Sequence, residues 1–197
     1  MYRTKDFGTH STYVENRETT KKLDFGHMAK KYKGKYRIDT TRAKWWDYSQ
    51  NGTYFITLNT LNRERFFGII SKGKMNLSNI GKIAQHCWEE IPNHFPFVNL
   101  GAFVIMPDHV HGILNINKKK KVDKSEKQYS TNTFGPQSKN LASVIRGYKI
   151  GVTKSARKTV SNFTWQSRYH DHIIRNPFEY KRIENYIIDN PKNWVNS

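Results

Sequence analysis

Two apolar runs on either side of Pro107 and Asp108 constrain the fold more than any other part of this sequence. Residues 102–106, AFVIM, and residues 109–116, HVHGILNI, are short and rich in aliphatic residues. Short runs of this kind, separated by a Pro-Asp turn signal, are typical of two neighbouring antiparallel strands. The chain is therefore expected to build an antiparallel sheet around this pair.

Other segments predict the elements that complete such a sheet. Residues 53–58, TYFITL, follow an Asn-Gly turn signal and predict a third strand. Apolar residues at helical spacing predict one helix over 76–91, ended by Pro92, and a second from about Ser138. Strands mixed with helices in this order indicate the α+β class, with an antiparallel sheet and helices packed on one face.

A last helix is expected to open at Asn176 and to stop before Pro191. Asn176 is a good cap residue, Pro177 suits the first helical position, and Glu179 follows at the third. The predicted helix therefore has a well-defined start.

The charge of the chain excludes several classes of function. Its 197 residues hold 34 Lys or Arg against 16 Asp or Glu, a formal net charge of +18 at pH 7. Residues 118–158 alone hold 12 of the basic residues and 2 of the acidic ones. This clustering favours a polyanionic partner over a small neutral ligand. The single cysteine, Cys87, excludes an internal disulfide framework and a Cys-rich zinc module.

The sequence also predicts where the protein acts. No apolar run approaches the roughly 18 residues that a membrane span needs, and the first residues lack the apolar core of a signal peptide. We therefore expect no membrane partner and a cytoplasmic protein. Residues 1–40 are polar and without sustained periodicity, which indicates a basic, flexible or loosely packed arm before a domain over 41–197.

Two pairs of residues are candidates for chemistry. His109 and His111 are two apart in a predicted strand, so both imidazoles project from one face and can share a divalent ion. Tyr186 and Asn190 are four apart on the last predicted helix and are therefore neighbours on its surface. A phenol becomes an effective nucleophile at neutral pH when a cation polarises the group that it attacks.

These residues carry a family resemblance. Residues 106–112, MPDHVHG, resemble the His-hydrophobic-His core of the HUH single-tyrosine transposases, and most closely the REP-associated tyrosine transposase group. Further stretches match the same pattern in the same order: Tyr48-Ser49, residues 52–57, Arg63-Glu64, residues 135–138, residues 146–149, residues 165–169 and residues 186–191. The resemblance covers about residues 42–194.

The resemblance implies a ferredoxin-like, RRM-like fold and a single-stranded DNA substrate, with hairpin-forming repeats as the expected target. By motif position, His109 and His111 would hold Mg²⁺ or Mn²⁺, and Tyr186 would be the nucleophile. Asn190 stands where the REP-associated group carries Asn and insertion-sequence transposases carry Gln as a further metal ligand. The resemblance further implies a nucleoid-associated protein of a bacterial-type cell, which would act as a monomer or a homodimer.

The expected reaction is attack of Tyr186 on a phosphodiester, which leaves a 5′-phosphotyrosine and a free 3′-OH. Such a sequence- or hairpin-specific endonuclease could also rejoin strands without ATP. The DNA would be held by basic and aromatic residues: Lys118, Lys119, Lys120, Lys121, Lys139, Arg146, Lys149, Lys154, Trp165 and Arg168.

Two alternatives stay open on the sequence alone. The chain could be a catalytically silent protein that binds single-stranded DNA or hairpins, or a metal-dependent phosphoesterase that uses water. A second His-x-His, His170 and His172, has no family motif beside it and is left out of the site.

Overall fold

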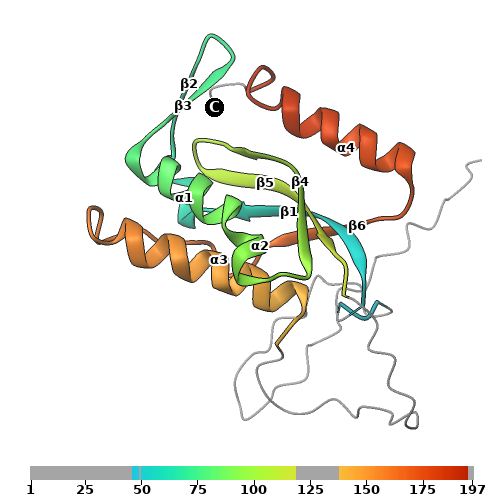
Figure 1. The fold of residues 1–197 in the computed structure, drawn as a ribbon. Helices are drawn as coiled ribbons and strands as arrows, with labels where there is room; N and C mark the ends of the chain where they lie inside the picture. Colours follow the sequence, from blue (N-terminus) through green and yellow to red (C-terminus); the bar gives the residue numbers. More distant parts are fainter. Residues whose placement is uncertain (1–45, 49, 119–137, 195–197) are drawn as a thin grey trace, which may run out of the picture. The chain divides into compact units, whose positions relative to one another are not determined.

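A four-stranded antiparallel sheet organises the computed structural model, which describes residues 46–48, 50–118 and 138–194 (Figure 1). Its strands are β1 (Gly52–Asn59), β4 (Val98–Ile105), β5 (His109–Ile116) and β6 (His170–Ile174), in the order β4-β5-β1-β6. β5 and β1 are therefore the central strands, and β4 and β6 are the edges. The expected arm, residues 1–40, lies outside the described residues.

The hairpin expected around Pro107 and Asp108 is confirmed. β4 and β5 pair antiparallel, and the backbone N–H of Met106 donates to the carbonyl of His109 across the two-residue turn. β4 starts at Val98, earlier than the apolar run suggested, because a register shift between Leu100 and Phe103 lets the strand continue through Gly101. A Cβ at Gly101 would lie 2.8 Å from the Tyr180 hydroxyl, so glycine is needed there.

Three short elements precede the first long helix and were not expected from the sequence. η1 (Leu61–Arg63) follows β1, and β2 (Gly68–Ser71) pairs with β3 (Lys74–Leu77) in a separate hairpin. Leu77, assigned to a helix by its spacing, ends β3 instead. The helix begins after Ser78, whose side chain accepts a hydrogen bond from the Gly81 N–H.

Four helices lie around the sheet in the described part of the chain. They are α1 (Asn79–Glu89), α2 (Ile91–His94), α3 (Leu141–Ala156) and α4 (Pro177–Asp189). Pro92 lies in the first turn of α2 rather than simply ending a helix, since proline suits that position. α3 is capped by Asn140 instead of Ser138, because Asn140 and Ser143 form a capping box. α4 starts and ends where the sequence predicts, with Asn176 as its cap.

The helices cover both faces of the sheet. Tyr54, Ile56 and Leu58 of β1 point into the larger core, where α1 and α3 pack. The alternate residues point the other way, and Phe55 lies against a smaller cluster of Ile113, Ile174, Ile183 and Ile187. Ile183 and Ile187 belong to α4, so this helix lies opposite α1 and α3 (Figure 1). The α+β class and the antiparallel sheet are confirmed, and α4 adds a helix on the second face.

Gly112, between the histidine pair and the apolar end of β5, contacts the larger core. Trp88 of α1 is fully buried over it, and a Cβ at Gly112 would lie 2.3 Å from Cζ2 of that indole. No residue larger than glycine fits without displacing a packed aromatic ring.

We expect Gly112→Ala to lower the free energy of unfolding by about 1–3 kcal/mol, because overpacking forces the core apart. Urea denaturation measures it. Gly151→Ala is the matched control: its Cβ would meet Cys87 Sγ at 3.6 Å, an ordinary contact. Within helix α3, that change should stabilise the protein by about 0.5–1 kcal/mol. Equal effects at both positions would contradict the prediction.

Candidate active site and basic groove

The two histidines of β5 lie on the sheet face that α4 covers. Register with β1 places His109 opposite Asn59 and His111 opposite Thr57, so all four side chains share that face. The imidazole centroids are 4.5 Å apart, with the ring planes at 72°. The intervening Val110 points into the opposite core. The alternation that the sequence predicted is confirmed.

His109 is held by the residue before it. Its Nδ1 bonds to Oδ1 of Asp108, and the other oxygen, Oδ2, pairs with Nε of Arg63 at 2.9 Å. Arg63 also donates to Oδ1 of Asn59 at 2.6 Å. Arg63 and Asn62 both have positive φ, 59° and 53°, so the backbone before β2 is strained to bring this guanidinium to the site.

The charge state of Asp108 fixes the orientation of the His109 ring. Burial acts to raise the pKa of the carboxyl, but the hydrogen bond with His109 and the charges of His109 and Arg63 outweigh it, so the pKa lies below its ordinary value. An ionised carboxylate only accepts hydrogen bonds, so His109 donates from Nδ1. In the neutral ring, the lone pair is then on Nε2.

His111 is buried and stays neutral. Burial lowers its pKa to about 3, and the nearby His109 and Arg63 add to that shift. Nδ1 lies 2.9 Å from the Thr57 hydroxyl, and Phe55 stacks on the ring with centroids 5.2 Å apart. The ring is therefore fixed on one side by β1 and presents Nε2 on the other.

Tyr186 of α4 lies over His111. Its hydroxyl is 3.4 Å from His111 Nε2, and the ring meets Phe55 edge-on with centroids 6.0 Å apart. Ile183 and Ile187 are buried on the same helix, which aims Tyr186 at the sheet margin, where its side chain is 50% exposed. The structure thus brings together three residues that the sequence singled out: His109, His111 and Tyr186.

Asn190 caps the C-terminal end of α4, one turn beyond Tyr186. Farther along the chain, Trp194 lies 5.8 Å from the His109 ring, centroid to centroid. The chain therefore passes both histidines between residues 186 and 194. In the described part of the chain, the Asn190 side chain makes no hydrogen bond with either histidine.

This arrangement fits a divalent cation. Metal-binding histidines usually donate their second ring nitrogen to a fixed acceptor, as His109 does to Asp108, and present the other as a neutral ligand. His111 is neutral and anchored through Thr57. No cluster of three His, Cys, Asp or Glu that could hold a metal occurs among the described residues, so an amide or substrate oxygen would have to complete the coordination.

Sequence reasoning missed the residues that support the histidines. Thr57 and Asn59 could be found only from the pairing of β1 with β5, which two isolated strand patterns do not specify. Asp108 had a local signal, since it directly precedes the first histidine. His170 of β6 pairs with Thr57 of β1 and lies on the same sheet face as the two histidines of β5. His172 is held by a hydrogen bond between its Nε2 and Glu179 of α4 at 2.7 Å.

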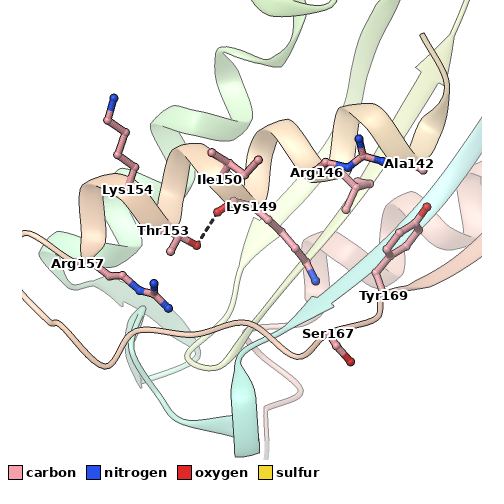
Figure 2. Close-up of a pocket in the computed structure, with 10 residues that line it drawn as sticks. Ala142, Arg146, Lys149, Ile150, Thr153, Lys154, Arg157, Ser167 and Tyr169 are labelled. Carbon is pink, nitrogen blue, oxygen red and sulfur yellow. Dashed lines mark hydrogen bonds between the residues drawn. The ribbon is translucent and has the colours of Figure 1, made fainter. Parts of the chain in front are cut away.

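The residues expected to bind DNA form two separate groups. Arg146, Lys149 and Lys154 lie along α3 and line a groove of about 530 Å³ (Figure 2). Lys118 lies beyond the end of β5 farthest from His109. Burial lowers the pKa of Lys118, Asp47 opposes that shift, and Lys139 is close enough to add a smaller lowering effect. Lys119, Lys120 and Lys121 fall outside the described residues.

Trp165 is placed differently from the expectation. Its side chain is 8% exposed and packs among Phe67, Tyr148 and Phe163, so it cannot stack on a base without leaving the core. The reason is a bridge between Trp165 and Thr60, which pulls the residue under the sheet margin. Arg168, two residues before β6, is exposed beside the groove.

Lys149 has a structural role within the groove. Its Nζ donates to the carbonyls of Gln166 at 2.8 Å and Arg168 at 3.2 Å, and lies 5.7 Å from the Trp165 ring centroid. Burial lowers the pKa of this ammonium group to about 8. Lys149 therefore fastens the segment 165–168 to α3.

This pKa predicts an alkaline gain in stability. Unfolding returns Lys149 to its ordinary pKa of 10.5, so between pH 8 and 10.5 the unfolded chain binds the proton more tightly than the folded one. The burial penalty is fully present below pH 8 and is relieved as the pH rises to 10.5. Thermal melts should show wild type gaining stability relative to Lys149→Met across this range. A difference between the two proteins that is independent of pH would contradict the prediction.

No helix in the part of the chain that the structure describes is long and apolar enough to cross a membrane.

Comparisons with known proteins give a close relative and a fold. No family model matches the chain. An uncharacterized protein of Haemophilus influenzae is 39% identical over 172 residues, which cover 85% of this chain and 96% of that protein. Among solved structures, a REP-associated tyrosine transposase bound to a REP hairpin matches with a TM-score of 0.53 and 22% identity, over 80% of this chain and 76% of that chain. A candidate transposase from Deinococcus radiodurans has a TM-score of only 0.43 at 13% identity, over 77% and 98% of the two chains.

Proposed function

The chain belongs to one family with the uncharacterized Haemophilus influenzae protein and has the fold of the REP-associated tyrosine transposase, and from this premise we propose that it is a transposase-like enzyme. It cleaves single-stranded DNA through Tyr186 with the help of a divalent metal, Mg²⁺ or Mn²⁺. The solved neighbour holds a REP hairpin, which supports hairpin-forming repeats as the target here.

One observation carries this proposal. The Tyr186 hydroxyl, on α4, lies 3.4 Å from His111 Nε2, on β5, although the two residues are 75 positions apart in the chain. A partly exposed phenol beside two anchored imidazoles is the arrangement that a covalent phosphoryl transfer needs. A protein that only binds DNA does not require such a phenol, so the arrangement favours an enzyme.

In the proposed step, Tyr186 Oη attacks the phosphorus of a phosphodiester. The Oη–P bond forms and the P–O3′ bond breaks, so the downstream strand stays attached as a 5′-phosphotyrosine. The upstream strand leaves with the electron pair of that bond on its 3′-oxygen, which becomes a 3′-OH on taking a proton. Reversal by a 3′-OH would rejoin strands, because the phosphotyrosine keeps the phosphodiester's energy.

The proton of Tyr186 has two routes out. His111 Nε2 is within reach of the hydroxyl, but this nitrogen has one lone pair and cannot both accept a proton and bind a cation. Because half of the Tyr186 side chain is exposed, water can take the proton when His111 is engaged as a ligand. The second route suits the proposed metal-dependent enzyme.

His109 and His111 would hold the cation through Nε2, with Asn190 as a further oxygen ligand. The cation, when bound, offsets negative charge on the non-bridging phosphate oxygens. Asp108, Thr57 and Arg63 keep the two imidazoles in position, so little reorganisation is needed when substrate binds.

The test is covalent capture. Purified protein with Mn²⁺ is mixed with single-stranded DNA from the repeats beside its gene, labelled at either the 5′ or the 3′ end, and run on a denaturing gel. A protein adduct that carries only the 3′ label, together with a 5′-labelled fragment that ends in 3′-OH, supports the proposal. Cleavage without an adduct overturns it in favour of water as nucleophile. Binding without cleavage overturns it in favour of the silent DNA-binding protein.

A further inference from the structure

The groove along α3 combines positive charge with apolar surface. Ile150, which is 59% exposed, lines it from α3, and Tyr169 lines it from the segment before β6 (Figure 2). Arg146 and Lys154 stand at its margins, about 12 Å apart along the helix at 1.5 Å per residue. The groove therefore offers apolar surface and positive charge side by side.

The cations of the groove divide into two kinds. Lys149 and Arg157 donate to the carbonyls of Gln166 and Phe163, so they hold the opposite wall against α3. Arg146 and Lys154 are exposed and make no ion pair with any residue that the structure describes. Two positive charges are therefore open to a ligand, while the other two build the place where it would lie.

The groove wall also connects to the active site. Gln166 donates its backbone N–H to the Asn59 carbonyl, and its side chain accepts a hydrogen bond from the Asn59 amide at 3.1 Å. Asn59 bonds in turn to Arg63, which pairs with Asp108 beside His109. Tyr169 lines the groove, and the next residue, His170, faces the side of the sheet where the histidine pair lies. The segment 166–170, at the edge of the sheet, therefore borders both the groove and the active site.

We propose that this groove binds an unpaired nucleotide of the single-stranded DNA that Tyr186 cleaves, which rests on the function proposed above. The base lies against Tyr169 and Ile150, and the flanking phosphates contact Arg146 and Lys154. Aromatic stacking together with flexible cations is the chemistry by which proteins hold single strands, because every unstacked base offers a flat apolar face. Paired bases in a duplex keep theirs covered, so the groove selects an unpaired one.

Binding is tested apart from cleavage, in the Tyr186→Phe background, by fluorescence anisotropy. The probes are a labelled (dT)20 strand, a 20-residue abasic strand with the same phosphates, and a 20-base-pair duplex. Tyr169→Leu should weaken binding of (dT)20 about tenfold and leave the other two unchanged. Arg146→Ala should weaken both single strands about fivefold and reduce the salt dependence of binding. Lys82→Ala, an exposed cation on α1 outside the groove, is the charge-matched control.

Three results would overturn the proposal. One is Arg146→Ala binding (dT)20 as tightly as Lys82→Ala does. Another is Tyr169→Leu weakening all three probes equally, which would show a loss of structure or of general affinity. The third is a wild-type preference for the duplex. If wild type still forms a covalent adduct at Tyr186, any of these outcomes would contradict only the proposed role of the groove and not the proposed function.

Discussion

Tyr186→Phe should yield no covalent protein–DNA adduct and reduce strand cleavage by at least about 10⁴-fold, because the substitution removes the one atom that forms the bond to phosphorus. The ring remains, so its contacts with Phe55 and His111 remain as well. Since only a 3.4 Å hydrogen bond at a half-exposed position is lost, the free energy of unfolding should change by less than about 1 kcal/mol.

Tyr180→Phe is the matched control for this variant. Tyr180 is on the same helix and packs against the cluster that holds α4 on the sheet, away from the histidines. It loses the same atom and should form the adduct as wild type does. The measurement is the denaturing gel with 3′-labelled DNA, read at several times. An adduct that persists in Tyr186→Phe would place the nucleophile elsewhere in the chain.

His111→Ala should lower the Mn²⁺-dependent cleavage rate by about a thousandfold, since stabilisation of the phosphate charge in the transition state is worth several kcal/mol. His111 is one of the two proposed ligands, and its low pKa means that it offers a neutral nitrogen throughout the physiological range. Binding of Mn²⁺ to the free protein, followed by calorimetry, should weaken in parallel. Raising the pH should not restore cleavage by His111→Ala. The wild-type imidazole is already neutral at physiological pH, so the variant loses a ligand and not a protonation state.

The second His-x-His provides the control for that result. His172 is exposed on β6, and its Nε2 is already bonded to Glu179 at the start of α4. His172→Gln can keep that bond, so cleavage should stay within about twofold of wild type, as expected for a surface substitution. Equal losses in His111→Ala and His172→Gln would mean that the site was assigned to the wrong strand.

The local parts of this structure follow from the sequence, and the long-range parts do not. The alternation of side chains along β5 and the start of α4 at Asn176 depend on residues that are close in the sequence. The apolar pattern and the capping residues therefore predict them. The stripe of Ile183 and Ile187 shows that α4 buries one side. It does not show on which sheet face, because either face offers apolar residues at alternate positions.

The same distinction explains why two residues of the basic region are more buried or more engaged than their local patterns indicate. Trp165 is followed by polar residues, so the local sequence suggests an exposed position. Its bridge to Thr60, 105 positions earlier, places it in the core instead. Lys149 has the spacing of an exposed helix face, yet two carbonyls of a later segment take its ammonium group. In both cases, the partner comes from a distant part of the chain that no local pattern identifies.

The alternation of β5 has a consequence for how mutations in this family combine. His109 and His111 lie on one face of β5. On the other face of the same strand, Val110 packs in the larger core and Gly112 contacts the Trp88 indole. A change in the volume of Trp88 therefore shifts the peptide units that set the separation of the two imidazoles. Substitutions at Trp88 should therefore reduce activity, and second-site suppressors should arise at residues that pack against it, such as Phe103, whose ring stacks on the indole.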